Sequence, residues 1–184
     1  MLRIIGGMWR GRKLRFPRSA QIRPTPDRVR ETLFNWLATR VPGARCLDLF
    51  AGSGALGLEA LSRGAAHVTF VERDAAAARE LQARLIEWQA SSARVQQMDA
   101  LRFLGHAPEA FDIAFLDPPF TSDLLAPASR LLQERQWLGP GALVYVEHPA
   151  REGQPPVPPG WTLARAKQAG EVGYYLWNAS IQGA

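Results

Sequence analysis

The sequence is poor in cysteine and histidine and contains no long apolar run. Its single cysteine, Cys46, excludes an internal disulfide and a Cys-rich zinc site, and its three histidines lack metal-ligand spacing. The charged opening sequence, MLRIIGGMWRGRK, lacks the apolar core of a signal peptide, and no later apolar run is long enough to span a bilayer. We therefore expect a cytoplasmic protein that holds no metal and does not associate with membranes.

Acidic residues are nearly absent from the first 30 positions. This segment contains nine of the 22 lysines and arginines but only one of the 17 acids, Asp27. Basic segments of this kind bind nucleic acids, because each lysine or arginine that neutralises a phosphate releases counterions. A solvated basic surface explains the same bias equally well, so charge alone does not decide between the two interpretations.

Strands and helices are expected to alternate along most of the chain. At 184 residues, 47% of them hydrophobic, the chain suits one domain with one core. An amphipathic helix is expected over 27–40, and five apolar strands with helices between them follow it. The strands are expected at 45–50, 67–72, 94–98, 111–117 and 142–147, the helices at 56–64, 75–89 and 124–138, and a closing antiparallel hairpin at 161–179. This order predicts an α/β fold whose mostly parallel sheet has helices on both faces and binds ligands at the carboxyl ends of its strands.

A glycine-rich turn follows the first expected strand, in the sequence DLFAGSGALGLEA. Gly52, Gly54 and Gly57 match the spacing G-x-G-x-x-G, which is a weak signal by itself. The spacing provides a tight turn and a helix N-terminus that faces a ligand. In an NAD-linked oxidoreductase, this loop would hold a pyrophosphate and Glu72 would hold the ribose hydroxyls.

Asp48 favours a different cofactor. A carboxylate just before the loop repels a pyrophosphate but pairs with an ammonium group, and S-adenosylmethionine has an ammonium and no phosphate. Asp48, Glu72 and Asp99 would then accept hydrogen bonds from the methionyl amine, the ribose and the adenine amine. Each acid also has a purely structural explanation, as a turn residue, a solvated strand end and a helix cap, respectively. Their positions at three successive strand ends favour the cofactor site.

The sequence Asp117-Pro118-Pro119-Phe120 stands at the end of the expected strand 111–117. A rigid turn would explain the two prolines. An exocyclic amine on a base is a poor nucleophile, because its lone pair is conjugated into the ring, so a catalyst must orient the amine and remove its proton. Asp117 and the Pro118 carbonyl could accept the hydrogens of the amine, and Phe120 could stack on a base that has left its helix. The motif therefore predicts methyl transfer to an exocyclic amine.

Several of these strings together resemble one known family. The chain resembles class I methyltransferases that act on exocyclic amines in DLFAGSGALGLEA, Glu72, Asp99 and the DPPF at 117. Two further sequences narrow the resemblance to the bacterial 16S rRNA guanine-N2 methyltransferases called RsmD; they are RIIGGMWRGRKL and RPTPDRVRETLFNWL. The resemblance covers nearly the whole chain. It implies a Rossmann-like class I fold with a seven-stranded sheet, in which a basic N-terminal β-extension (1–25) that binds RNA precedes a catalytic core (26–184).

The same resemblance implies a substrate, a cofactor and a set of site residues. The substrate would be the N2 amine of guanine 966 (Escherichia coli numbering) of 16S rRNA, in the small ribosomal subunit or its assembly intermediate. A monomeric enzyme would convert S-adenosylmethionine to S-adenosylhomocysteine without a metal. The implied residues are Asp48, Phe50, Gly52, Gly54, Glu72, Arg73, Asp99 and Ala100 for the cofactor, Asp117, Pro118 and Phe120 for the guanine, and Arg10, Arg12, Lys13, Arg23 and Thr25 for RNA. The resemblance also implies that Arg23, Pro24 and Thr25, which match the family's RPT, close over the active site. Pro26 departs from the family pattern, in which a second threonine is expected.

Three alternatives remain open from the residues themselves. An N6-adenine or N4-cytosine methyltransferase has a closely similar acidic-Pro-Pro-aromatic motif, although it usually carries a separate target-recognition domain. An NAD-linked oxidoreductase is disfavoured by Asp48, and a non-catalytic RNA-binding module is disfavoured by the complete set of acids. Two further residues are expected in structural roles, Cys46 as a buried small hydrophobe and Trp9 as an anchor of the extension rather than a platform for RNA.

Overall fold

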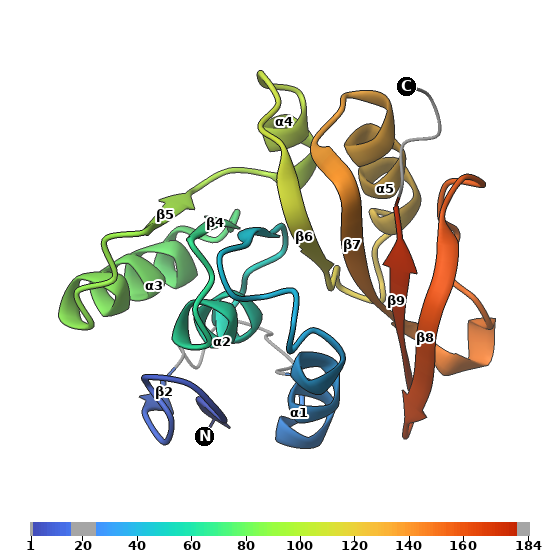
Figure 1. Ribbon diagram of the computed structural model, residues 1–184. Coiled ribbons are helices and arrows are strands. Elements are labelled where there is room, and N and C mark those ends of the chain that lie inside the picture. Colours follow the sequence, from blue (N-terminus) through green and yellow to red (C-terminus); the bar gives the residue numbers. More distant parts are fainter. Residues whose placement is uncertain (1, 16–24, 180–184) are drawn as a thin grey trace.

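A computed structural model describes residues 2–15 and 25–179 of the chain (Figure 1). Within this part, a seven-stranded sheet has the order β5-β4-β3-β6-β7-β9-β8, and a separate two-stranded hairpin lies near the N-terminus. The predicted α/β fold with a mostly parallel sheet is therefore confirmed. No helix in the described ranges is long and apolar enough to cross a membrane.

Five parallel strands form the body of the sheet, and two antiparallel strands close one edge. Each apolar run predicted as a strand forms one, with ends that differ by a few residues. The parallel strands are β3 (Arg45–Asp48), β4 (His67–Val71), β5 (Ala93–Gln96), β6 (Phe111–Leu116) and β7 (Leu138–Pro149), and the closing hairpin consists of β8 (Thr162–Ala169) and β9 (Val172–Asn178).

Helices cover both faces of the sheet (Figure 1). One hydrophobic cluster packs three helices against the sheet, α1 (Asp27–Trp36), α2 (Ala55–Ser62) and α3 (Ala75–Glu87), and a second cluster packs two, α4 (Ala100–Leu104) and α5 (Leu125–Glu134). Neighbouring residues of β3 divide between the clusters, Cys46 into the first and Leu47 into the second, because successive side chains of a strand point to opposite faces.

Some predicted element boundaries were wrong. The helix expected over 27–40 ends at Trp36, and the helix expected over 124–138 ends at Glu134. Residues after Glu134 turn instead, so that β7 begins at Leu138, earlier than predicted. The five-residue helix α4 was not predicted, because so short a segment carries little periodicity. A 3-10 turn, η1 (Ala150–Glu152), lies in the connection between β7 and β8.

The apolar face of the predicted amphipathic helix is buried. Val29, Leu33, Phe34 and Leu37 of the first helical segment are each no more than 1% exposed. Cys46 is fully buried within β3, and burial raises the pKa of its thiol to about 12. Such a thiol is neither a nucleophile nor a metal ligand at neutral pH, in agreement with its predicted structural role.

The N-terminal hairpin, β1 (Leu2–Arg3) with β2 (Lys13–Leu14), docks on α2. The Met8 N–H donates to the Ser62 carbonyl at 2.8 Å and the Trp9 N–H donates to the Ser62 hydroxyl at 2.9 Å. The Trp9 ring is buried 5.1 Å from the ring of Trp88, which follows α3. Trp9 is therefore an anchor, as predicted, and the hairpin is part of the folded domain.

Candidate active site

Acidic side chains follow one another along the carboxyl edge of the parallel strands. Asp48 is the last residue of β3, Glu72 follows β4, Asp99 lies shortly after β5 and Asp117 follows β6. The structure adds Glu147, near the end of β7, to these four predicted residues. Glu147 was missed as a functional residue, although it ends the predicted strand 142–147 just as the other acids end theirs.

Two of these acids shape the glycine-rich loop. The Gly52 N–H donates to Glu72 Oε2 at 2.7 Å, and the Gly57 N–H donates to Asp48 Oδ2 at 3.0 Å. Gly54 has a φ of 77°, and a Cβ there would lie 2.6 Å from Leu81 Cδ1, so a larger residue would strain the backbone and push the Leu81 side chain aside. The loop is therefore held in one conformation by the same acids that were predicted to bind the cofactor.

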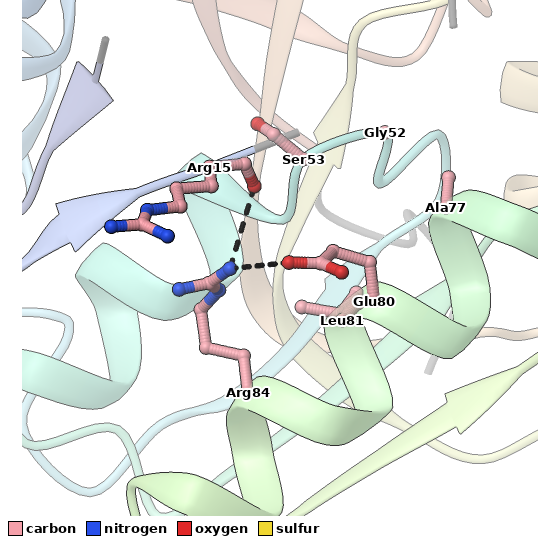
Figure 2. Close-up of a pocket in the computed structure, with 7 residues that line it drawn as sticks. All are labelled: Arg15, Gly52, Ser53, Ala77, Glu80, Leu81 and Arg84. Atoms are coloured by element: carbon pink, nitrogen blue, oxygen red, sulfur yellow. Dashed lines mark hydrogen bonds and ion pairs between the residues drawn. The ribbon is translucent and has the colours of Figure 1, made fainter. Parts of the chain in front are cut away.

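The loop lies beside α3 and the end of the N-terminal hairpin (Figure 2). Gly52 and Ser53 line a small cavity of about 10 Å³ together with Ala77, Leu81 and Arg15. Arg84 connects α3 to the end of the N-terminal hairpin, because its Nη2 contacts Glu80 on α3 at 2.7 Å and the Arg15 carbonyl after β2 at 3.4 Å. Because this cavity has room for no more than one water molecule, it is a packing gap and not the cofactor site itself.

Asp48 is 2% exposed, and burial raises the pKa of its carboxyl to about 7. The hydrogen bond from Gly57 opposes this increase of the pKa, and the charge of Glu72 adds to it. A cation beside Asp48 would relieve both the desolvation and the repulsion between the acids. The site therefore fits the ammonium and sulfonium of S-adenosylmethionine, whereas a pyrophosphate would add further negative charge.

We expect Asp48→Asn to change the pH dependence of stability. Between the unfolded pKa of 3.8 and the folded value of about 7, the native state holds one proton more than the unfolded state, so Asp48 lowers the unfolding free energy as pH rises. The slope is at most about 1.4 kcal/mol per pH unit. Asparagine keeps an oxygen for the Gly57 N–H but does not titrate.

Urea unfolding at several values between about pH 4 and pH 8 measures this difference. The asparagine variant should gain stability over the parent as pH rises to about 7, with a constant difference above that value. The exposed Asp123→Asn serves as the control and should follow the parent. Parallel curves for Asp48→Asn and the parent would mean that Asp48 is already ionised in the folded protein.

Asp117 lies in a second acidic group on the same edge. Burial raises the pKa of Asp117 well above its usual value, with further increases from the charges of Glu147 and Asp48, whereas the hydrogen bond from Thr25 lowers it. The Thr25 hydroxyl donates to Glu147 Oε1 at 2.7 Å and lies 3.5 Å from Asp117 Oδ2, and the Tyr145 hydroxyl donates to Glu147 Oε1 at 2.9 Å. A carboxyl with a raised pKa can accept a proton near neutral pH.

The turn after Asp117 is rigid and presents an aromatic ring. The Ser122 N–H and hydroxyl both donate to the Pro119 carbonyl, at 2.9 and 2.6 Å. Among the described residues no group donates to the Pro118 carbonyl. Phe120 is 36% exposed, unusual for so large an apolar side chain. An acceptor pair beside an exposed ring is the arrangement expected for holding a planar base that carries an amine.

The other residues predicted for the cofactor differ in their surroundings. Asp99 caps α4, accepting hydrogen bonds from the N–H groups of Leu101 and Arg102 at 2.9 and 3.2 Å, so its alternative role as a helix cap is real. Ala100 is buried in the first turn of that helix, Phe50 is half-buried and Arg73 is exposed. The roles of these residues in cofactor binding stay predictions.

The predicted RNA-binding residues do not form one group. Arg10, Arg12 and Lys13 are exposed on the hairpin, where the Arg12 guanidinium lies 5.2 Å from the Trp88 ring. An open groove of about 660 Å³ runs between this basic edge and α3. Thr25, in contrast, is 5% exposed and faces the carboxylates of Asp117 and Glu147. Arg23 lies outside the described residues.

Comparison with known proteins gives one family over almost the full length. The family model described as conserved hypothetical protein 95 matches residues 2–178. Ribosomal RNA small subunit methyltransferase D of Escherichia coli K12 is 51% identical over 99% of this chain and 92% of its own length. The protein of the same name from Haemophilus influenzae is 48% identical over 96% of this chain and 93% of its own length.

Solved structures agree with this relationship. An Escherichia coli protein provisionally described as a methyltransferase superposes with a TM-score of 0.92 at 49% identity, covering 98% of this chain and 99% of its own. An RNA methyltransferase from Salinibacter ruber, solved with S-adenosyl-L-homocysteine, superposes with a TM-score of 0.67 at 19% identity, covering 88% of this chain and 97% of its own. At this identity, the similarity supports the fold alone. The chain therefore belongs to the family described as conserved hypothetical protein 95, and it is a methyltransferase with the class I fold.

Proposed function

We propose that this chain transfers a methyl group from S-adenosylmethionine to the exocyclic N2 amine of the guanine equivalent to 966 in 16S rRNA. The observation that carries the proposal is Asp117-Pro118-Pro119-Phe120 at the end of β6, on the sheet edge that also holds the acid-lined glycine loop. The names of the relatives from Escherichia coli and Haemophilus influenzae support ribosomal RNA of the small subunit as the substrate. We further propose that the chain acts as a monomer on the subunit or its assembly intermediate.

The cofactor would lie along the ends of β3, β4 and β5. Asp48 would hold the ammonium, Glu72 the ribose hydroxyls and Asp99 the adenine amine, with Gly52 and Gly54 allowing close approach of the backbone. Phe50, Arg73 and Ala100 complete the proposed pocket. When bound, the cofactor supplies a methyl group activated by a positively charged sulfur.

The base would lie against the end of β6. Asp117 and the Pro118 carbonyl accept the two hydrogens of the amine and thereby aim its nitrogen, while Phe120 stacks on the ring with about 1 to 3 kcal/mol of stacking energy. Aimed in this way, the nitrogen lone pair would be the nucleophile for the methyl group that the bound cofactor supplies, and the sulfur would keep the electron pair of the broken bond. The nitrogen then loses its extra proton, and the Asp117 carboxylate is the group placed to receive it.

The N-terminal hairpin would hold the RNA backbone. Arg10, Arg12 and Lys13 are exposed together on it, and their replacement by glutamine should weaken the salt dependence of RNA binding. For a single-stranded region, the slope of log affinity against log salt falls by about 0.7 for each phosphate that the protein no longer neutralises. RNA binding at several salt concentrations, followed by fluorescence anisotropy, measures that slope.

A matched control has the same change of charge elsewhere. Arg151, Arg165 and Lys167 lie at the other end of the chain, and their replacement by glutamine should leave the slope near that of the parent. An unchanged slope in the hairpin variant would mean that the hairpin does not touch RNA. Equal decreases of the slope in both variants would indicate a diffuse effect of net charge.

The proposed function is tested by tritium transfer from labelled S-adenosylmethionine to unmodified small subunits and to their naked RNA, followed by nucleoside analysis. Label in N2-methylguanosine supports the cofactor, the acceptor atom and the substrate together. Label in N6-methyladenosine, in N4-methylcytidine or only in DNA would keep the chemistry and overturn the proposed base. Comparing subunits with naked RNA identifies the form of the substrate.

A further inference from the structure

Thr25 and Glu147 meet the proposed catalytic acid from two different parts of the chain. Thr25 directly precedes Pro26 and helix α1, and Glu147 lies on β7, 122 residues away. Both side chains are buried, at 5% exposure each, and both contact Asp117. We propose that Thr25 and Glu147 are positioning residues that hold the Asp117 carboxyl toward the methyl-acceptor amine, an inference that rests on the proposed function.

The distances show how one hydroxyl can serve both acids. The Thr25 hydroxyl has a single hydrogen, and the 2.7 Å contact to Glu147 Oε1 is a normal O–H···O bond, whereas 3.5 Å to Asp117 Oδ2 is long. In this arrangement the Thr25 hydrogen is directed to Glu147, and Asp117 Oδ2 receives only a weak contact from it. Rotation about the threonine C–O bond can turn the same hydrogen toward Asp117, where it would stabilise the ionised Asp117 carboxylate.

Glu147 is oriented by its own donors. The hydroxyls of Thr25 and Tyr145 both donate to its Oε1, so this oxygen acts as an acceptor, and the Glu147 carboxyl is also hydrogen-bonded to that of Asp117. Two carboxyl groups in contact ionise together only at a cost, so the pair favours one shared proton. This sharing limits the orientations open to Asp117 and keeps it able to take up the proton that the amine releases.

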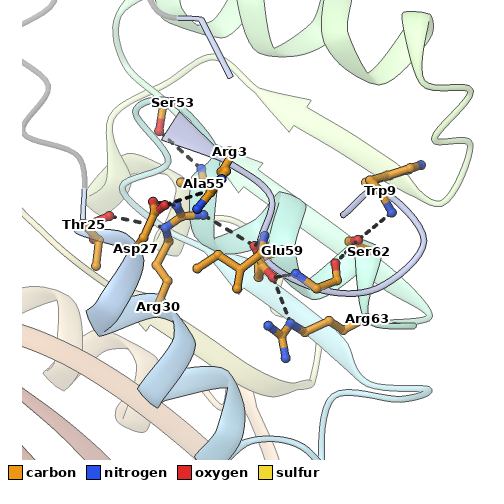
Figure 3. Close-up of polar contacts among 12 residues, drawn as sticks. Arg3, Trp9, Thr25, Asp27, Arg30, Ser53, Ala55, Glu59, Ser62 and Arg63 are labelled. Carbon is orange, nitrogen blue, oxygen red and sulfur yellow. Dashed lines mark hydrogen bonds and ion pairs between the residues drawn. The ribbon is translucent and has the colours of Figure 1, made fainter. Parts of the chain in front are cut away.

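Thr25 is itself held by a buried ionic network (Figure 3). Arg30, which is fully buried, donates from Nε to the Thr25 carbonyl at 3.3 Å and contacts Asp27 at 2.5 Å and Glu59 at 3.4 Å. Glu59 also accepts the N–H groups of Ile5 and Gly6 in the N-terminal hairpin, at 2.9 and 2.8 Å. The hairpin, α1 and α2 thus fix the backbone from which Thr25 reaches the active site.

A structural role for Thr25 would explain the same bonds, because a buried hydroxyl needs a partner wherever it lies. The two roles differ in what their loss changes. A structural hydroxyl contributes mainly to stability, whereas a positioning hydroxyl contributes to turnover with little effect on substrate affinity.

Thr25→Val tests this directly, because valine has the shape of threonine without the hydroxyl, and Thr25→Ser restores the hydroxyl. We expect Thr25→Val to lower kcat by about 10- to 100-fold, the range for one hydrogen bond to a charged group, with KM for cofactor and RNA within about threefold of the parent. Thr25→Ser should retain kcat within about threefold. Glu147→Gln, which removes the shared proton but keeps an acceptor for Thr25, should also lower kcat more than it changes KM.

A carbon-13 titration of the Asp117 carboxyl gives a second readout that does not depend on activity. The titratable groups that face Asp117 among the described residues are Asp48 on β3 and Tyr145 and Glu147 on β7. Since the Thr25 hydrogen bond lowers the pKa of Asp117, Thr25→Val should raise that pKa, whereas Glu147→Gln should lower it by removing a neighbouring negative charge.

The outcomes separate this inference from the proposed function. If Thr25→Val matches Thr25→Ser in both kcat and the Asp117 titration, the positioning role is wrong. If the titration shifts as expected but the parent methylates no guanine, the contact between Thr25, Glu147 and Asp117 is retained and the proposed substrate is wrong. A loss of kcat together with an equal rise of KM would place Thr25 in substrate binding and overturn its assignment as a positioning residue.

Discussion

Replacing Asp117 with alanine should lower turnover by about 10²- to 10⁴-fold, the range for a group that orients a nucleophile and accepts its proton. Cofactor affinity should stay within about threefold of the parent, because Asp117 is proposed to contact the base and not the cofactor. Single-turnover methylation of RNA with excess enzyme measures the chemical step, and calorimetric titration with S-adenosylhomocysteine measures the affinity.

Asp123→Ala is the matched control, since Asp123 is an exposed acid in the connection after the same motif. It should leave turnover close to that of the parent. Equal losses of turnover and cofactor affinity in Asp117→Ala would move Asp117 into the cofactor site and leave the amine without its proposed acceptor. A normal rate would remove Asp117 from the mechanism.

Replacing Glu59 with alanine should lower the unfolding free energy by about 3 to 5 kcal/mol, because it breaks a buried ionic network and leaves charge uncompensated. Glu59 is fully buried on α2, where it contacts Arg63 at 2.9 Å and Arg30 at 3.4 Å and accepts two N–H groups of the hairpin. Removing it strips Arg30, also fully buried, of one of its two acidic partners. Urea unfolding at neutral pH measures the change.

Glu80→Ala provides the comparison. Glu80 pairs with Arg84 at 2.7 Å in the same helical i, i+4 spacing, but its side chain is 45% exposed, so we expect a loss of about 1 kcal/mol or less. Because Glu59 also anchors the hairpin, Glu59→Ala should weaken RNA binding in addition. Similar losses of stability in the two variants would show that the buried network contributes no more than a surface ion pair.

The acids at the strand ends show how far sequence reasoning reaches. Asp48, Glu72 and Asp117 each stand at the end of an apolar run, and the carboxyl ends of parallel strands share one edge, so their common position followed from the chain alone. The predictions that Cys46 is a buried small hydrophobe and that Trp9 anchors the extension are also confirmed. The roles of individual acids toward the cofactor stay predictions.

Glu147, Thr25 and Glu59 show where sequence reasoning stopped. The Thr25–Glu147 bond joins positions 122 residues apart, and Glu59 receives the N–H groups of Ile5 and Gly6 across more than 50 residues. No local pattern encodes such contacts. The resemblance implies that Thr25 closes over the active site and binds RNA, but its hydrogen-bond partners, the carboxylates of Asp117 and Glu147, come only from the structure.

The sequence by itself determined the alternation of strands and helices, the glycine loop and the acids at the strand ends, because these depend on local periodicity, turn chemistry and the geometry of a parallel sheet. Only the tertiary structure decided that the N-terminal hairpin docks on α2 through Ser62 and Glu59, and that Thr25 and Glu147 join Asp117. The physical reason is that these bonds form between segments distant in the chain, whose approach is set by the packing of two hydrophobic clusters around the sheet.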